Sequence, residues 1–320
     1  MRILVTGGTG FIGSALVDQL RLHNSVFVLT RNDAFDANRK ENTEYARGDL
    51  LSAEDTNTVV AHYRPEIIVH LAAYTPVRFS FDKPHAYTNA NYVATVNLVE
   101  AAVRARCVRQ FVYASTAEIY GPYAEDHSVT EESNPAPTSP YSISKLAGEH
   151  YVVYGPHRDR NMHYTVLRST NTFGRKFNLP DEARGYFMEK LIIGLLKNEP
   201  VDFDGFPESK RRWMYVTDHV NGYLKVIGNT KAFDQVFNIA PEEPAASLEE
   251  VVEITKKITG STSEVTWAND PRPIDPNYID IVPTKAFKAF GYSAKVPLRT
   301  GISTAVEYWS GVLSPRDVKV

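Results

Sequence analysis

Short apolar stretches alternate with longer stretches of helical periodicity along the first half of the chain. The apolar stretches have the length of strands and lie at 2–7, 25–30, 66–73, 110–116 and 164–170. Strands that helices cover on both faces have this composition. The segments between them place apolar residues at helical spacing, at 11–22, 53–63, 84–105 and 141–154. The alternation predicts an α/β fold with a doubly wound parallel sheet.

After residue 174 the alternation weakens, and prolines and glycines become frequent. Apolar spacing still predicts helices at 185–197, 217–228, 247–259 and 300–310 and one more strand at 235–240. We therefore expect a sheet domain made of 1–174 together with returns of the chain near 211–240. The segments 175–210 and 241–320 are expected to form a smaller α+β lobe. This lobe would cover the carboxyl edge of the sheet, where open α/β sheets bind ligands.

Composition narrows the class of protein. The chain has 320 residues, is 43% hydrophobic and 23% charged, and carries a net charge of −3, so we expect no nucleic-acid partner. No stretch approaches the roughly 18 apolar residues of a membrane span, and glycines interrupt the apolar N-terminus, so neither a membrane partner nor a signal peptide is expected. The single cysteine, Cys107, excludes an internal disulfide and fits a reducing cytoplasm.

The histidines give no sign of a metal site. His70 lies inside an apolar stretch and is interpreted as a core residue that faces the cleft. His219 is interpreted as packing at the start of a helix. Neither belongs to a cluster of metal ligands in the sequence, so no metal is expected.

A glycine-rich turn follows the first predicted strand. In "TGGTGFIG", Gly7 permits a tight turn, Gly10 lets a pyrophosphate approach the backbone, and Gly13 lets the next helix pack against the strand. The backbone N–H groups and the positive helix end favour an anion at this place. Because the turn lies at the start of a βαβ unit, the motif predicts a dinucleotide site.

The residues at the end of the second predicted strand help to distinguish NAD from NADP as the cofactor. An acidic residue there commonly binds the ribose hydroxyls of NAD, but this chain has Thr30 and Arg31. Arg31 suits a 2′-phosphate, which favours NADP, whereas Asp33 could bind the ribose of NAD if the turn is displaced. Asp49 and Leu50, placed after a third strand, suit the edge of the adenine.

The segment "YSISK" places Tyr141 and Lys145 four residues apart, on one face of a predicted helix. A cationic lysine and an oxidised nicotinamide would each stabilise a tyrosinate, which would lower the pKa of Tyr141 and make it a general base. Tyr186 and Lys190 have the same spacing. They lie beyond the expected boundary of the sheet domain, so Tyr141 and Lys145 are the predicted pair.

The motifs "TGGTGFIG", "HLAA", "YASTAEIYG", "YSISK" and "RRWMYVTDHV" together resemble the extended short-chain dehydrogenase/reductase family. More narrowly, they are similar to its nucleotide-sugar epimerases and dehydratases, over nearly the whole chain. The resemblance implies a Rossmann domain that binds NAD or NADP and a C-terminal lobe for a nucleotide-diphosphate sugar. It also implies a homodimer formed by helices at about 84–105 and 141–156.

The resemblance also assigns site residues. The cofactor positions fall on Gly7, Gly10, Phe11, Ile12, Gly13, Asp49, Leu50, Leu71, Ala72, Tyr141 and Lys145. The hydroxyls of Ser115 and Thr116 would hydrogen-bond the reacting sugar hydroxyl. In the substrate lobe, the family's diphosphate, phosphate and nucleoside contacts fall on Asn171, Arg212, Arg272 and Asp275. Arg78, after the fourth strand, could face the sugar or lie on the surface.

The type of reaction is indicated by the segment Thr116-Ala117-Glu118. The family's 4,6-dehydratases carry Thr-Asp-Glu at this place, its uronate decarboxylases carry Thr-Ser-Glu, and simple hexose epimerases often lack the Glu. Alanine cannot donate a proton, so Ala117 disfavours ordinary dehydration, while Glu118 counts against the plainest epimerase. Glu118 itself is either a catalytic group or a carboxylate that braces the loop.

The leading prediction is therefore a cytoplasmic nucleotide-sugar 4-epimerase that resembles UDP-glucose 4-epimerase and oxidises C4 transiently with bound NAD, or alternatively NADP. A 4,6-dehydratase and a UDP-glucuronate decarboxylase are the alternatives. From another class, a catalytically silent protein that senses NAD or NADP stays open, although the full set of Tyr141, Lys145, Ser115 and Thr116 argues against it.

Overall fold

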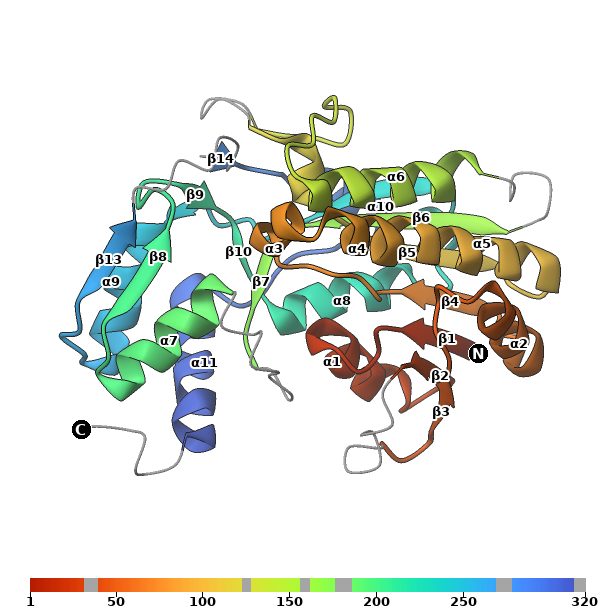
Figure 1. Ribbon diagram of the computed structural model, residues 1–320, viewed down its shortest axis with the longest axis horizontal. Coiled ribbons are helices and arrows are strands. Elements are labelled where there is room, and N and C mark those ends of the chain that lie inside the picture. Colours follow the sequence, from red (N-terminus) through yellow and green to blue (C-terminus); the bar gives the residue numbers. More distant parts are fainter. Residues whose placement is uncertain (32–39, 123–127, 156–161, 176–185, 269–277, 314–320) are drawn as a thin grey trace.

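A computed structural model describes residues 1–31, 40–122, 128–155, 162–175, 186–268 and 278–313. Its centre is a seven-stranded parallel sheet with the strand order β11-β6-β5-β4-β1-β2-β3 (Figure 1). The strands are β1 (Arg2–Thr6), β2 (Ser25–Thr30), β3 (Thr43–Arg47), β4 (Ile67–His70), β5 (Gln110–Thr116), β6 (His163–Ser169) and β11 (Gln235–Ile239). The order reverses between β1 and β4, which is where such a sheet opens a crevice for a ligand.

Helices cover both faces of this sheet (Figure 1). One face packs against α2 (Ala53–Tyr63), α5 (Ala94–Ala105) and α6 (Pro140–Tyr154), and the other against α1 (Phe11–Leu20) and α8 (Val216–Val226). Side chains alternate along β1, so Leu4 packs on the face covered by α2, α5 and α6, while Ile3 and Val5 pack on the face covered by α1 and α8. This two-sided burial explains the continuous apolar pattern, and the predicted fold class is confirmed.

A smaller lobe joins the carboxyl edge of the sheet (Figure 1). Its larger elements are α7 (Phe187–Lys197), β8 (Val201–Asp204), α9 (Leu248–Thr259), β13 (Val265–Ala268) and α11 (Leu298–Val312). Its shorter strands are β9 (Lys210–Arg211), β10 (Trp213–Tyr215), β12 (Ala246–Ser247) and β14 (Tyr278–Ile279), and β10 pairs with β7 (Asn171–Phe173). Between β14 and α11 the chain also forms α10 (Thr284–Phe290), which packs against β11 of the large sheet, where Phe290 contacts Phe237. The chain returns to the large sheet through α8 and β11, while the predicted domain boundaries stay a prediction.

Two local features fix the helices that flank the site. Ser139 caps α6 through a reciprocal pair of hydrogen bonds with Ser142, and Pro140 occupies the first turn. The predicted helix at 84–105 is interrupted, because α4 (Pro84–Thr88) passes into a π-helical turn, η2 (Asn89–Val93), before α5 begins. The Asn91 side chain in this turn binds the backbone N–H and carbonyl of Tyr74 and so holds the loop after β4.

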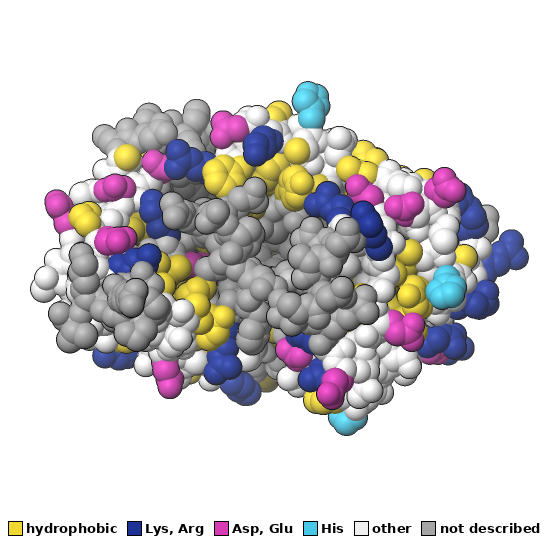
Figure 2. Space-filling view, turned by 60° about the horizontal axis from the view of Figure 1, so that its bottom comes forward, with side chains coloured by type: hydrophobic (Ala, Val, Ile, Leu, Met, Phe, Trp, Pro, Cys, Tyr) yellow, Lys and Arg dark blue, Asp and Glu magenta, His cyan; other side chains and the backbone are white. Residues whose placement is uncertain are grey.

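Helices of the described ranges are all too short or too polar to cross a membrane. The described residues likewise hold no cluster of three or more potential metal ligands. Figure 2 shows acidic and basic side chains interspersed over the visible face, in keeping with the small net charge.

Candidate active site

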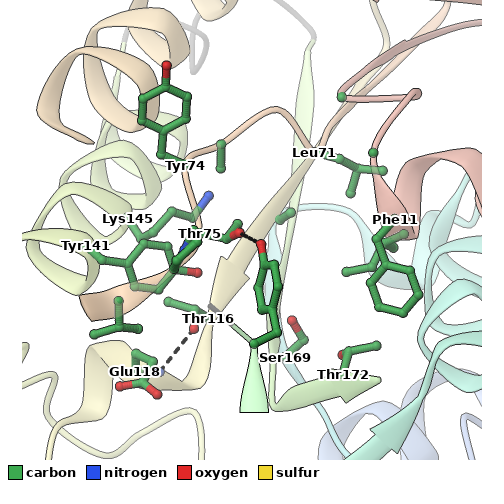
Figure 3. Close-up of a pocket in the computed structure, with 18 of the residues that line it drawn as sticks. Phe11, Leu71, Tyr74, Thr75, Thr116, Glu118, Tyr141, Lys145, Ser169 and Thr172 are labelled. Carbon is green, nitrogen blue, oxygen red and sulfur yellow. Dashed lines mark hydrogen bonds between the residues drawn. The ribbon is translucent and has the colours of Figure 1, made fainter. Parts of the chain in front are cut away.

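A cavity of about 790 Å³ lies at the carboxyl edge of the large sheet. The loops that follow β1, β2, β3, β4, β5 and β6 line one side, and residues of α7, β8, β9 and β10 line the other. The cavity therefore lies between the sheet domain and the smaller lobe, as the sequence pattern predicts. In Figure 3, Tyr141 and Lys145 of α6 lie beside Thr116 of β5 and Thr75 of the loop after β4, at one part of this cavity.

The glycine-rich turn after β1 is packed closely against its surroundings. Gly7 has a φ of +68°, and a Cβ atom there would lie 2.6 Å from the Ala72 nitrogen. A Cβ at Gly13 would lie 2.1 Å from the Gly7 carbonyl oxygen. Gly7 and Gly10 line the cavity, whereas Gly13 allows α1 to begin directly against the turn. The close packing at Gly7 and Gly13 agrees with a tight turn and with close helix packing, while the pyrophosphate contact at Gly10 stays a prediction.

The first turn of α1 faces the cavity with its backbone. Gly10 provides the N-cap, no side chain caps the helix, and the first turn contains no acidic residue. Phe11 and Ile12 line the cavity beside it. Because the first N–H groups of a helix carry partial positive charge, this end of α1 is suited to a diphosphate.

The far end of the cavity is formed by the residues that follow β2 and β3. Arg31, Asp49 and Leu50 line it, as predicted for an adenosine site. Asp49 Oδ1 accepts a hydrogen bond from the Leu51 N–H at 3.0 Å, so this carboxylate also braces its own turn. The Arg31 guanidinium lies 5.9 Å from the centre of the Tyr74 ring. Asp33 lies outside the described residues.

Tyr141 and Lys145 lie side by side on α6, and both are buried at the wall of the cavity (Figure 3). The Lys145 ammonium lies 4.3 Å from the centre of the Tyr113 ring. Thr116, at the end of β5, hydrogen-bonds the Tyr141 hydroxyl, which lowers the pKa of Tyr141. Leu71 and Ala72, after β4, complete the predicted cofactor wall.

Burial has the larger effect on both titrating groups of this pair. It raises the pKa of Tyr141 above its ordinary value, and the nearby Glu118 raises it further. It lowers the pKa of Lys145 to about 7. The predicted lowering of the Tyr141 pKa by Lys145 is thus not produced by the protein groups. A positive charge beside Tyr141 is needed for the phenol to give up its proton near neutral pH.

Ser115 and Thr116 have different environments, although the sequence assigned both hydroxyls to the sugar. Side chains alternate along a strand, so the two residues point to opposite faces of β5. The Ser115 hydroxyl donates to Glu149 Oε2 at 2.5 Å, on the side of α6. Ser115 also lines the cavity, but its hydroxyl is held by Glu149, whereas the Thr116 hydroxyl contacts Tyr141; the assignment of Ser115 to the sugar stays a prediction.

Ala117 and Glu118 form the start of a single 3-10 turn, η3 (Ala117–Tyr120). The Thr116 side chain caps this turn by accepting a hydrogen bond from the Glu118 N–H at 3.2 Å. Ala117 is buried, and both residues line the cavity. The Glu118 carboxyl lies near Tyr141 and Thr116 in Figure 3. The position between Thr116 and Glu118 thus presents a methyl group to the site.

The predicted phosphate ligand Arg212 has another role. Its guanidinium is buried, pairs with Asp280 and donates to the Pro241 carbonyl oxygen at 2.7 Å, and it does not line the cavity. The neighbouring Arg211 lines the cavity instead, together with Trp213. Residues two apart on an extended segment share one side, which places Arg211 with Trp213. The guanidinium that reaches the site is therefore that of Arg211.

The other predicted substrate contacts divide into two groups. Asn171 and Arg78 line the cavity, and Arg78 forms an ion pair with Asp204 of β8 across it. Arg272 and Asp275 lie outside the described residues. Sequence reasoning also missed lining residues from the smaller lobe, because their positions depend on how the lobe folds over the sheet. These residues are Tyr186, Phe187, Lys190, Phe203, Asp204, Arg211 and Trp213.

Both predicted core histidines are buried and neutral. Burial and the nearby Lys145 charge lower the pKa of His70 to about 3, and its ring lies between the hydroxyls of Thr6 and Thr95. Burial lowers the pKa of His219 to about 3 as well. His219 contacts Thr172 through Nδ1 and also lines the cavity, which its position at a helix start did not reveal.

Comparisons with known proteins agree with this geometry. The model of the NAD dependent epimerase/dehydratase family matches residues 3–240. A dTDP-glucose 4,6-dehydratase of Streptomyces niveus is 30% identical, over 97% of this chain and 93% of that protein. Crystal structures of UDP-glucose 4-epimerases are also similar. The enzyme of Thermotoga maritima, solved with UDP-glucose, has a TM-score of 0.88 and 28% identity, with 98% of this chain and 100% of that one covered. The enzyme of Thermus thermophilus, solved with NAD, has a TM-score of 0.87, 29% identity and the same coverage.

Proposed function

This chain belongs to the NAD-dependent epimerase/dehydratase family, and from that premise we propose that it is a nucleotide-sugar 4-epimerase. Its substrate would be a UDP-hexose or a related nucleotide-diphosphate sugar. The sugar would bind between Tyr141 and the smaller lobe, and NAD would bind along the glycine-rich turn.

Different parts of the cavity suit different parts of NAD. The close approach of Gly7 and Gly13 leaves room for the diphosphate at the uncapped start of α1. The nicotinamide would then lie near Tyr141 and Lys145, with the adenosine near Asp49 and Arg31. When bound, NAD supplies an acceptor for hydride from C4 of the sugar and a donor for its return.

The chain supplies the proton transfer. Tyr141 takes the proton of the C4 hydroxyl as that carbon becomes a ketone, and it returns a proton when the ketone is reduced from the other face. Protonated Lys145 stabilises the tyrosinate, because a positive charge nearby favours the charged form of an acid. Thr116 donates a hydrogen bond at the same place and keeps the phenol oriented toward the sugar.

The epimerase proposal rests on one observation: the residue between Thr116 and Glu118 at the cavity is Ala117, which offers only a methyl group. Loss of water from C5 and C6 needs a group that takes the C5 proton and a group that protonates the departing hydroxyl. Among the described residues that line the cavity, the carboxylates are Asp49, Glu118 and Asp204. Asp49 lies at the adenosine end and Asp204 pairs with Arg78. Glu118 alone is near Tyr141, and epimerisation at C4 needs neither additional group.

The dehydratase alternative has its own support. The Streptomyces niveus relative is a dTDP-glucose 4,6-dehydratase, and Glu118 lies beside Tyr141, where a C5 base would be needed. Glu118 also lies where a decarboxylase could use a carboxylate. Both alternatives keep the first oxidation at C4, so they differ from the epimerase in the fate of the ketone.

Incubation with a panel of nucleotide sugars distinguishes these reactions. We expect a product of unchanged mass with inverted configuration at C4, read by mass spectrometry and proton NMR. A loss of 18 Da, the mass of water, would establish a dehydratase instead, and a loss of 44 Da, that of carbon dioxide, a decarboxylase; both masses follow from elemental composition, and either result would overturn the epimerase assignment. UDP- and dTDP-linked glucose, galactose and glucuronate form the smallest useful panel.

Two adjacent arginines provide a matched test of the substrate site. Arg211→Ala should raise KM for the nucleotide sugar by about tenfold or more, because it removes a charged group that suits a diphosphate. Arg212→Ala should instead lower the free energy of unfolding by about 3–5 kcal/mol, because it breaks a buried ion pair with Asp280. The reverse pattern in steady-state kinetics and urea unfolding would show that Arg212 is the substrate ligand.

We also propose a cytoplasmic homodimer that pairs through α5 and α6. Its support is the pair of large apolar side chains that α6 exposes, with Ile143 54% and Tyr154 67% exposed. Ile143→Asp should convert the dimer to a monomer in light-scattering chromatography, because a charge would be buried at the interface. Phe287→Asp, at an equally exposed apolar position on α10, is the control and should leave the dimer intact. A monomeric wild type would refute the proposal.

A further inference from the structure

A buried ion pair lies beneath the site, outside every motif used above. Glu149 is 1% exposed and lies on α6, one turn beyond Lys145 and two turns beyond Tyr141. Arg168 of β6 binds both of its carboxylate oxygens, with the shortest contact, Nη2 to Oε1, at 2.6 Å. Helical spacing therefore places a phenol, an ammonium group and a carboxylate along one buried side of α6.

Further hydrogen bonds hold this pair in place. Arg168 donates from Nη1 to the Tyr120 hydroxyl at 2.6 Å, and that hydroxyl donates to Asn238 Oδ1 of β11 at 2.8 Å. The Asn238 N–H donates to the Glu131 carboxylate at 2.7 Å. Because every member is hydrogen-bonded, the pair has a fixed position in the core.

The same pair connects α6 to β5. Ser115 donates to Glu149, and Tyr113, two residues earlier on the same face of the strand, donates to the Lys145 carbonyl oxygen at 3.1 Å. Gly148 permits this close packing, since a Cβ there would lie 2.5 Å from the Tyr113 hydroxyl. Thr116 follows Ser115 directly. The contact with Glu149 thus fixes the end of β5 relative to Tyr141.

The charged and titratable groups around Lys145 come from several elements. Tyr113 of β5 lies under its ammonium, His70 of β4 is neutral, and Tyr141 and Glu149 flank it on α6. Arg168 of β6 binds the Glu149 carboxylate. Burial lowers the pKa of Lys145, and the charge that raises it is that of Glu149.

We propose that Glu149, held by Arg168 and Ser115, is a positioning residue that keeps Lys145 protonated and α6 in register with β5. The inference rests on the proposed function in one respect, that protonated Lys145 assists Tyr141. The carboxylate acts on Lys145 through space, since one helical turn separates them. Arg168 orients the carboxylate through its contacts with both Glu149 oxygens, and the Tyr120 hydroxyl accepts a further hydrogen bond from Arg168.

The sign of the effect follows from this arrangement. A nearby carboxylate favours the charged form of lysine, so its removal lowers the Lys145 pKa further below its ordinary value. Lys145 would then lose its proton at a lower pH. The alkaline limb of the pH profile of kcat would shift to lower pH by the same amount.

The direct test measures the titration of Lys145 by NMR in protein labelled with ¹³C at the lysine ε-carbon, with Lys145→Met to assign the signal. Glu149→Gln should lower the Lys145 pKa by about one unit, which is a tenfold change in its protonation equilibrium. Glu100→Gln is the matched control. Glu100 accepts a hydrogen bond from Tyr151, also on α6, and this substitution should leave the Lys145 pKa unchanged.

If Glu149→Gln does not fold, a second variant can still test the proposal. The double variant Glu149→Gln/Arg168→Gln removes both buried charges and should restore the melting temperature. Its Lys145 pKa should still lie below that of the wild type, but by less than in Glu149→Gln, because loss of the Arg168 charge favours protonated Lys145. An unchanged Lys145 pKa in a folded variant would overturn the proposal and leave Glu149 a purely structural residue. The NMR titration does not depend on turnover, so failure to find a sugar substrate would affect the proposed function alone.

Discussion

Tyr141→Phe is expected to abolish turnover of the nucleotide sugar, lowering kcat by roughly 10²- to 10⁴-fold. The substitution removes one oxygen, and with it the group that takes and returns the C4 proton. Tyr141 is buried against Thr116 and Lys145 and is not needed to close the cavity, so the variant should still bind NAD. Stopped-flow measurement of NAD reduction by the sugar in a single turnover would locate the loss in the oxidation step.

Tyr186→Phe is the matched control. The Tyr186 hydroxyl contacts Thr75 in the same cavity, and Lys190 follows Tyr186 at the same spacing as Lys145 follows Tyr141. This variant should keep kcat within about tenfold of the wild type, since it loses one hydrogen bond but no proton-transfer group. Full activity in Tyr141→Phe together with an inactive Tyr186→Phe would reverse the assignment of the base.

Gly13→Ala is expected to weaken NAD binding by about 100-fold, the equivalent of roughly 3 kcal/mol of overpacking. The new methyl group would meet the Gly7 carbonyl oxygen at 2.1 Å. That neighbour is backbone and cannot rotate away, so α1 must move out from the turn that carries the diphosphate. Isothermal titration with NAD measures the change in Kd directly.

The control for this variant is Gly311→Ala in α11. A Cβ at Gly311 has no other atom within 4 Å. Alanine is favoured over glycine inside a helix by about 1 kcal/mol, so this variant should be slightly more stable than the wild type and bind NAD normally. Equal NAD affinity in Gly13→Ala would show that the turn tolerates displacement and that the glycine serves stability alone.

The large sheet could be predicted from the sequence because most of its strands are buried on both faces. Ile67, Ile68 and Val69 of β4, for instance, are all at most 3% exposed, so the apolar pattern has no gaps. β3 lacks such a pattern because it lies at the edge of the sheet with half-buried side chains. The π-helical turn η2 has no signal in apolar spacing, since it changes one hydrogen-bonding step inside a continuous helix.

The sequence was sufficient to place residues at the cavity where a motif fixes the backbone conformation. It was less sufficient where the direction of a side chain decides whether the residue reaches the cavity. Gly7, Thr116 and Tyr141 lie at the cavity as expected. Arg211 and Arg212 are chemically identical, so only the strand register assigns one to the cavity and the other to Asp280. A closer use of the period of two, starting from Trp213, would have selected Arg211.

Ser115 and Glu149 are two further residues whose side-chain contacts could not be predicted from the sequence. Ser115 has the right chemistry for a sugar contact, but strand alternation turns its hydroxyl toward α6. Glu149 follows Tyr141 and Lys145 at helical spacing, which was a usable signal. The partner of Glu149 is Arg168 on a different strand, and this contact depends on the tertiary fold.

The place of β11 in the sheet has a consequence for biosynthesis. The whole of β11 pairs with β6, from Gln235 with Thr165 to Ile239 with Ser169, yet β11 is made long after β6. A nascent chain that leaves the ribosome therefore holds β6 as an open edge until the first half of the smaller lobe has also emerged. Arg168 lacks its link through Tyr120 to Asn238 for the same interval. The half of the enzyme that is synthesised first cannot finish folding first, and a fragment ending near residue 174 should be prone to aggregate.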